Sequence, residues 1–208
     1  MYKNFFKRLI DFVIALCGTP FLLIIFLVVA PLIYLEDKGP VFYNATRRGK
    51  DGKDFKMYKF RSMYVNSPDL RNEDGSTYNG ENDPRVTKIG KILRKTSLDE
   101  TPQLLNILKG DMSIIGPRPA LWNQDDLIEE RDKYNVHSVL PGLTGWAQIN
   151  GRDELEIPVK AKFDGEYIEK MSLLFDIKIF FGTIIKVFKH DGIVEGKVEK
   201  EENKEEVK

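Results

Sequence analysis

The longest apolar segment of the chain runs from Phe12 to Leu35, which is 24 residues without a charged side chain. At about 1.5 Å per residue, a straight helix of this length crosses the hydrocarbon core of a bilayer, which is roughly 30 Å thick. A signal peptide fits poorly, because the run is long and no small-residue cleavage site follows it. The pattern predicts a membrane-anchoring helix within residues 1–38.

Thr19 and Pro20 interrupt this segment, because proline lacks an N–H and disfavours helical geometry in the residue before it. Since both flanks are basic, the positive-inside tendency favours a re-entrant hairpin with both ends in the cytosol. An ordinary kinked transmembrane helix is the alternative, because membrane helices tolerate proline. The flanking cations are Lys3, Lys7 and Arg8 before the segment and Lys38, Arg47, Arg48 and Lys50 after it.

Apolar and polar positions partly alternate from Val41 to Met63, around the favoured hairpin dipeptide Asp51-Gly52. This pattern predicts a β-hairpin. Lys59 and Arg61 are two residues apart, so they share one face of the second strand, where they either reach a phosphate or are solvated. The next stretch, residues 66–84, is rich in Asn, Asp and Gly and predicts a mobile loop.

Helical spacing returns further along the chain. Val86 to Leu93 predicts an amphipathic basic helix, and Ser172 to His190 predicts another. Each apolar face either covers the core or rests on a membrane surface. Residues 121–134 predict a further helix, and residues 141–152, with three glycines, predict a loop.

The predicted fold class is therefore α+β and mostly helical. It consists of the re-entrant membrane helix hairpin, the β-hairpin and a small domain with amphipathic interfacial helices. The domain spans residues 39–194. Residues 195–208 are nearly all Glu, Lys and Val, which predicts a disordered charged tail.

The overall composition narrows the classes of function. Lys+Arg and Asp+Glu are both 32, so the chain has no net charge and we expect no general affinity for nucleic acid. A single cysteine, Cys17, excludes an internal disulfide. His137 and His190 are the two histidines, too few for a His-rich metal site. Residues 85–118 are locally basic, which suits a phosphorylated ligand, an anionic lipid surface or a solvated helix face.

Asp99 and Glu100 form an acidic pair ahead of a predicted helix. In one frame Ser97 begins a capping box. In another, Thr101 is the N-cap and Pro102 the first helical residue. Most acidic pairs in such a position act as helix caps and have no chemical role.

Cations around this pair favour a chemical role. Arg94 precedes the pair, and Arg118 lies between two prolines in a stiff loop. A planar guanidinium held in this way can bind two phosphate oxygens at once. A carboxylate, several cations and a helix end together suit phosphoryl chemistry, with the carboxylate as a nucleophile or Mg²⁺ ligand. No Walker loop is present, which excludes a P-loop nucleotidase.

Several long motifs then occur in an order that resembles the bacterial sugar transferases, the monotopic polyprenyl-phosphate phosphoglycosyl transferases. They are KRLIDF (7–12), KGPVFY (38–43), YKFRSM (58–63), NDPRVTKIGKILRKTSLDETPQLLNILKGDMSIIGPRP (82–119), PGLTGWAQINGR (141–152) and FDIKIFFGTIIKVF (175–188). The resemblance covers nearly all of the chain outside the far N-terminus, the polar loop and the tail. In this family the membrane helix enters and leaves one leaflet at a Ser-Pro pair, which matches Thr19-Pro20 here. Pro31 departs from that pattern.

The resemblance implies a UDP-sugar donor, a polyprenol (undecaprenyl) phosphate acceptor and assistance by Mg²⁺ near Asp99. Asp99 matches the family's nucleophile, which displaces UMP and carries the phosphosugar until the lipid phosphate removes it. Glu100 matches the second acidic residue. Arg94 and Arg118 match phosphate-holding arginines, and the further candidates for substrate contacts are Lys59, Arg61 and Arg85, with Gln148, Asn150 and Arg152 at the nucleotide end.

The expected location is the cytosolic face of the bacterial inner membrane, in contact with its lipids. The family-based expectation for the sugar is an N-acetylated amino sugar. Two other hypotheses remain open. In one, Asp99 only binds Mg²⁺ and the lipid phosphate displaces UMP directly. In the other, the protein is a non-catalytic membrane scaffold of polysaccharide assembly.

Overall fold

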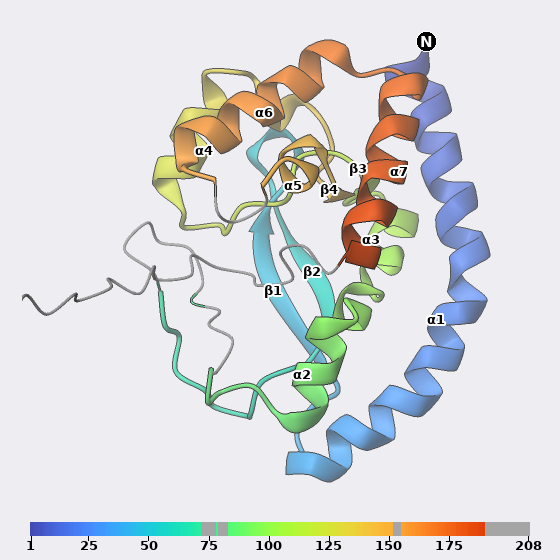
Figure 1. The fold of residues 1–208 in the computed structure, drawn as a ribbon, viewed down its shortest axis with the longest axis vertical. Coiled ribbons are helices and arrows are strands. Elements are labelled where there is room, and N and C mark those ends of the chain that lie inside the picture. The colour runs from blue at the N-terminus through green and yellow to red at the C-terminus, as the bar shows by residue number, and fades with distance from the viewer. Residues whose placement is uncertain (72–77, 79–82, 152–154, 190–208) are drawn as a thin grey trace, which may run out of the picture.

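The computed structural model describes residues 1–71, 78, 83–151 and 155–189. As predicted, the fold is α+β and mostly helical (Figure 1). The predicted tail, residues 195–208, lies outside the described residues. The helices are α1 (Lys7–Asp37), α2 (Lys88–Lys95), α3 (Gln103–Lys109), α4 (Asp125–Asp132), α5 (Trp146–Ile149), α6 (Ile157–Lys170) and α7 (Leu173–Lys189). The strands are β1 (Phe42–Arg48), β2 (Asp54–Phe60), β3 (Ser113–Ile115) and β4 (Gly142–Thr144).

The predicted apolar helix is confirmed as α1, which is long and apolar enough to cross a membrane by length and composition. The helix continues through Thr19, Pro20 and Pro31. Thr19 Oγ1 donates to the carbonyl of Ala15 at 2.9 Å, a bond within the same helix. The structure thus has one curved helix along the side of the domain, where the sequence favoured two helical arms (Figure 1).

Both ends of α1 are bound to the rest of the protein. Near its beginning, Lys7 forms an ion pair with Asp176 of α7 at 2.8 Å, and Asp11 accepts a hydrogen bond from the backbone N–H of Ile114 at 3.0 Å. Near its end, the carboxylate of Glu36 accepts from the first two backbone N–H groups of α2, at 2.6 and 3.2 Å. The helix is therefore fixed to one domain along its length.

The predicted β-hairpin is confirmed. Strands β1 and β2 pair antiparallel from Phe42 opposite Phe60 to Arg48 opposite Asp54. The turn contains Asp51, with φ of 54°, which is a backbone conformation that short polar side chains tolerate. Stacked aromatic rings join the hairpin to α1: the centroid of Phe42 lies 5.6 Å from that of Phe26 and 5.4 Å from that of Phe60.

The amphipathic basic helix is confirmed as α2. Thr87 caps it by accepting from the backbone N–H of Gly90 at 2.8 Å, and Leu93 is buried. A Cβ at Gly90 would lie 2.0 Å from the carbonyl oxygen of Ser62, so only glycine allows this close approach. Helices α4 and α7 confirm the other two predicted helices in position and type.

Residues 141–152 contain more structure than the predicted loop. Strand β4 pairs parallel with β3, and α5 follows it directly. A Cβ at Gly116 would lie 2.6 Å from the carbonyl oxygen of Leu140, so the two backbones pack with no room for a side chain. The short sheet fixes where the loop containing Arg118 leaves β3. Sequence patterns missed these elements because strands of three residues are too short to show a period.

Candidate active site

Asp99 and Glu100 lie in a short 3₁₀ turn, Leu98–Glu100, between α2 and α3. Within the described residues, the side chain of Ser97 makes no cap hydrogen bond, so the predicted capping box is absent. The second frame is also wrong, because α3 begins at Gln103 and Pro102 occupies its N-cap position. The acidic pair is therefore not explained as a helix cap.

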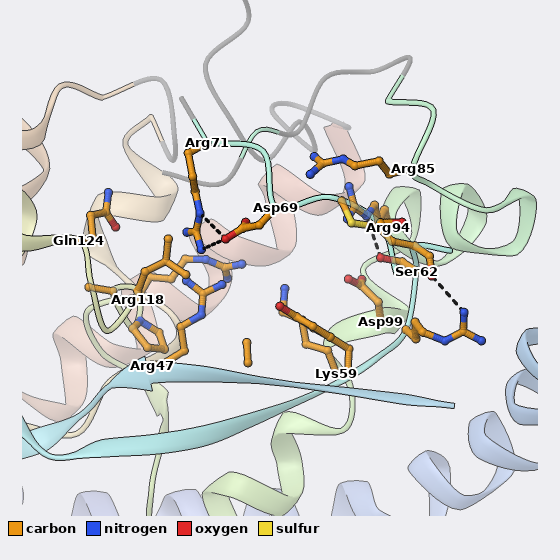
Figure 2. A pocket seen from close by; sticks show the side chains of 18 of the residues that line it. Arg47, Lys59, Ser62, Asp69, Arg71, Arg85, Arg94, Asp99, Arg118 and Gln124 are labelled. Atoms are coloured by element: carbon orange, nitrogen blue, oxygen red, sulfur yellow. Dashed lines mark hydrogen bonds and ion pairs between the residues drawn. The ribbon is translucent and has the colours of Figure 1, made fainter. Parts of the chain in front are cut away.

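A cavity of about 520 Å³ lies in front of this turn (Figure 2). This volume is in the range of small-molecule binding sites. Asp99 lines the cavity and is 6% exposed. The other walls come from the β-hairpin, residues 61–71, the loop from Arg118 to Leu121, α5 and α6. The cavity is thus lined by parts of the chain that are far apart in the sequence.

Glu100 is held between two cations. Lys59 Nζ lies 2.8 Å from its Oε1, and both terminal nitrogens of Arg118 donate to its carboxylate, at 2.6 and 3.3 Å. Burial alone would raise the pKa of Glu100, but the positive charges of Arg118 and Lys59 outweigh it and hold that pKa well below its usual range. Glu100 is therefore ionised at neutral pH and keeps Lys59 and Arg118 beside Asp99.

Arg94 and Ser62 form part of the same cavity wall. Arg94 Nε donates to Ser62 Oγ at 2.9 Å, and both residues line the cavity near Asp99 (Figure 2). Gly90 approaches the Ser62 carbonyl closely, which brings α2 against the end of the hairpin. Arg94 of α2 is thereby placed within hydrogen-bond distance of Ser62. The structure thus brings Asp99, Glu100, Arg94, Lys59 and Arg118 together, as the phosphoryl hypothesis requires.

Arg61 lines the cavity, but its guanidinium binds the end of α1. It forms a two-pronged ion pair with Asp37, with one contact at 2.6 Å, and donates to the carbonyls of Pro40 and Met63. The backbone N–H of Val65 also donates to Asp37, at 3.1 Å. This arrangement connects the end of α1 to the cavity wall.

The guanidinium of Arg85 is also bound by other groups of the protein. Its guanidinium pairs with Asp83, at 2.6 Å for the shortest contact, and donates to the carbonyls of Pro68 and Tyr78. The hydrogen bonds between the two side chains raise the pKa of Arg85 and lower that of Asp83. Both side chains are almost fully buried. The contacts of Arg61 and Arg85 favour a structural role over the predicted contact with phosphate.

We expect Arg61→Gln to lower the stability of the protein more than its affinity for a donor. Removing one member of a largely buried ion pair costs about 3–5 kcal/mol, because the other charge is left uncompensated. Thermal unfolding in detergent measures this loss. Arg71→Gln is the matched control, since Arg71 also pairs with an aspartate and lines the cavity but is more exposed. A folded Arg61→Gln protein with wild-type stability and a weakened donor affinity would contradict the expectation.

The residues predicted for the nucleotide end are only partly placed. Gln148 of α5 lines the cavity, and its Nε2 donates to the carbonyl of Leu143 at 3.3 Å. Asn150 is exposed and donates to the carbonyl of Trp146 at 2.8 Å; it is not part of the cavity wall. Arg152 lies outside the described residues.

The structure also adds wall residues that sequence patterns gave no reason to select. Arg131 of α4 and two residues one turn apart on α6, Lys160 and Asp164, line the cavity. Part of the predicted mobile loop, from Asn66 to Asp69, does so too. No local signal could have found them, because their place depends on how α4, α6 and the loop pack around the hairpin.

Comparison with known proteins shows the family to which the chain belongs. Residues 2–190 match the family model described as bacterial sugar transferase. The UDP-glucose:undecaprenyl-phosphate glucose-1-phosphate transferase of Escherichia coli is 47% identical over 77% of this chain, which corresponds to 35% of that protein. The sugar transferase EpsL of Bacillus subtilis is 42% identical over 90% of this chain and 89% of its own length.

A third relative, from Aeromonas hydrophila, is a UDP-N-acetylgalactosamine-undecaprenyl-phosphate N-acetylgalactosaminephosphotransferase. It is 40% identical over 86% of this chain and 43% of its own length. This chain therefore spans about a third to two fifths of the two relatives whose substrates are named, and nearly all of EpsL. Because the family model covers most of its length, the chain belongs to the bacterial sugar transferase family.

Proposed function

We propose that this protein transfers a sugar 1-phosphate from a UDP-sugar to polyprenol phosphate and releases UMP. The observation that carries the proposal is Asp99 in the wall of the cavity, beside a glutamate held by Lys59 and Arg118. The two relatives with named substrates act on a UDP-sugar and undecaprenyl phosphate. The product would be the first membrane-bound intermediate of a surface glycan such as a capsule, O-antigen, exopolysaccharide or glycoprotein.

In the first step, a carboxylate oxygen of Asp99 attacks the phosphorus next to the sugar. The bond from this phosphorus to the bridging oxygen of the diphosphate breaks, and UMP leaves with the electron pair. The result is an aspartyl phosphosugar, which splits a difficult transfer between two anions into two steps at one site. Arg94, Lys59 and Arg118 offset the charge that builds up on the phosphoryl oxygens.

In the second step, an oxygen of the polyprenol phosphate attacks the same phosphorus. The bond to Asp99 breaks, which restores the carboxylate and releases a polyprenyl diphosphosugar. Glu100 assists both steps by holding Lys59 and Arg118 in place. Gln148 also lines the cavity, and we propose that it contacts the nucleotide. We propose the same role for Asn150 and Arg152, which follow Gln148 along the chain.

Asp99 is the residue that would hold Mg²⁺. Mg²⁺ is often bound by one or two carboxylates together with substrate phosphates and water. Asp99 lines the cavity, so Asp99 is the member of the pair that could share a metal with the donor. When bound, Mg²⁺ would neutralise charge on the diphosphate.

We propose that α1 lies within one leaflet and that both of its ends face the cytosol of the bacterium. Its beginning is bound to β3 and α7 and its end to α2, all in one domain. A helix held at both ends by the same domain has its ends on the same side of the membrane. Exposed apolar side chains cover the rest of its surface, including Phe21, Ile24 and Leu27. The cavity would then meet the soluble donor and the lipid phosphate at the membrane surface.

This topology predicts that cysteines replacing Lys3 and Lys50, in a Cys17→Ser background, resist an impermeant thiol reagent in intact cells. Both positions are exposed in the structure, so they should react once the cells are permeabilised. Pro20→Ala tests whether the proline contributes to the bend of α1. Labelling of the Lys3 position alone in intact cells would mean that α1 crosses the membrane.

UMP release by the purified protein tests the proposed function. UDP-sugars with and without an N-acetyl group should be screened, because the two relatives with named substrates differ in this group. UMP release without lipid and parallel initial-rate lines would support the two-step route, whereas intersecting lines would favour direct displacement by the lipid. If the folded protein releases no UMP from any donor, with or without polyprenol phosphate, the result would favour the hypothesis of a non-catalytic scaffold.

A further inference from the structure

A buried ion pair joins α4 to α6 behind the loop that contains Arg118. Two guanidinium nitrogens of Arg131, Nε and Nη2, donate to Oδ2 of Asp164 at 2.9 and 2.6 Å. The side chains are 3% and 1% exposed. Taking two charges out of water is costly, and such a pair is often no more stable than well-packed apolar residues. Its presence beside the cavity therefore suggests a role beyond stability.

The remaining nitrogen of this guanidinium reaches the loop. Arg131 Nη1 donates to the backbone carbonyl of Arg118 at 2.9 Å. Because the guanidinium is planar, the two bonds to Asp164 fix the direction of the third. Each of the three nitrogens of Arg131 thus donates to a protein atom, two to Asp164 and one to the loop, so Arg131 is suited to hold the loop.

The loop depends on such external contacts. Pro117 and Pro119 on either side of Arg118 have no backbone N–H, so they cannot donate hydrogen bonds within the loop. Its carbonyls are instead held from three directions. The backbone N–H of Gly142 donates to Pro117 at 2.9 Å, Arg131 donates to Arg118, and the backbone N–H of Arg48 donates to Ala120 at 3.0 Å. Arg131 is the one of these donors that acts on Arg118 itself.

We infer that Arg131, oriented by Asp164, is a positioning residue that sets the Arg118 guanidinium against Glu100 and the cavity. The inference rests on the proposed function, in which Arg118 takes part in the transfer. Arg118 binds Glu100 through two nitrogens at 2.6 and 3.3 Å, a geometry that a rotation of the loop peptide would break. Arg131 would therefore act on the reaction through Arg118, without touching the substrate.

Arg131→Lys is the informative replacement. Lysine keeps the positive charge opposite Asp164, which preserves the fold best. Its single ammonium on a flexible stem cannot reproduce the planar arrangement that joins the carboxylate to the Arg118 carbonyl. We expect kcat/KM for the UDP-sugar, measured by UMP release, to fall at least tenfold, with the loss mainly in kcat.

A double-mutant cycle separates positioning from a general structural role. In an Arg118→Ala background, Arg131→Lys should change kcat/KM less than twofold, because the side chain that it positions is gone. Arg48→Gln is the matched control. Arg48 Nη2 also donates to a carbonyl of this segment, that of Trp122 at 3.2 Å, but acts four residues after Arg118. We expect this variant to stay within twofold of the wild type.

The outcomes distinguish the inference from the function on which it rests. An equal loss from Arg131→Lys in both backgrounds would overturn the positioning role while leaving the proposed function intact. Wild-type turnover of the Arg118→Ala protein would instead remove Arg118 from the reaction. If Arg131→Lys does not fold, Asp164→Glu takes its place in the same cycle, because the longer carboxylate shifts Arg131 and keeps the charge pair. An equal loss from Asp164→Glu in both backgrounds would then overturn the positioning role, and wild-type turnover of Arg118→Ala would again remove Arg118 from the reaction.

Discussion

Asp99→Asn is expected to abolish turnover, the largest effect of any single replacement in this protein. The amide is nearly the same size as the carboxylate but is a poor nucleophile, and it is a weaker ligand for Mg²⁺ because it has no charge. Asp99 is buried in the cavity wall and is not the N-cap residue of the 3₁₀ turn or of α3, and asparagine keeps its size and its side-chain oxygen. The loss should therefore appear in a folded protein, with thermal unfolding close to the wild type.

Mass spectrometry tests the same prediction at the level of the modified residue. Incubating the wild-type protein with a UDP-sugar and Mg²⁺, without lipid, should add one sugar phosphate to a peptide that contains Asp99. Asp99→Asn should prevent this adduct.

Glu100→Gln is the matched control for this experiment. It should be badly impaired because it loosens Lys59 and Arg118, but the intact Asp99 should still carry the adduct. An adduct mapped to Glu100, or full turnover by folded Asp99→Asn, would contradict the assignment of Asp99 as the nucleophile.

Elements with a clear period were predictable from the sequence. The apolar run that became α1, the amphipathic patterns of α2 and α7, and the hairpin around Asp51-Gly52 all appear where expected. In each case the local pattern and the tertiary packing favour the same structure. The strands β3 and β4 were not predictable, because three-residue strands depend on each other and not on a local period.

The continuity of α1 could not be predicted from the local sequence alone. Proline removes one backbone hydrogen bond, which favours a break at Thr19-Pro20. Contacts far from that point keep the helix continuous: Asp11 is bound to β3, and Glu36 to the first turn of α2. Packing along the whole helix thus outweighs a local preference, and the sequence shows only the local preference.

The sequence predicted which charged residues belong to the site, but it did not predict which other groups each of them binds. Asp99, Arg94, Lys59 and Arg118 line the cavity, and Glu100 is bound to Lys59 and Arg118. Arg61 and Arg85 were selected for the same reason, their positive charge. They are instead bound to Asp37 and Asp83. A sequence shows that a cation is present, whereas only the fold shows which carboxylate or carbonyl has already engaged it.

Arg118→Lys is expected to lower turnover roughly 10- to 150-fold, although it keeps the positive charge. A charge-assisted hydrogen bond contributes about 1.5–3 kcal/mol, and lysine has one ammonium in place of a two-nitrogen fork. Steady-state UMP release measures the loss, with thermal unfolding as the control for folding. Arg48→Lys is the matched replacement that should leave turnover unchanged, because Arg48 is a partly exposed arginine of β1 that pairs with Asp54 and does not line the cavity.

The structure allows two roles for the Arg118 fork, and one cycle separates them. Both terminal nitrogens bind Glu100, so Arg118→Lys acts either by releasing Glu100 or by losing a grip on the donor phosphates. If holding Glu100 is the whole role, Arg118→Lys should add nothing to the loss already caused by Glu100→Gln. If Arg118 also grips phosphate in the transition state, the two losses should largely add, which is the result we expect. Near wild-type turnover by folded Arg118→Lys would exclude both roles.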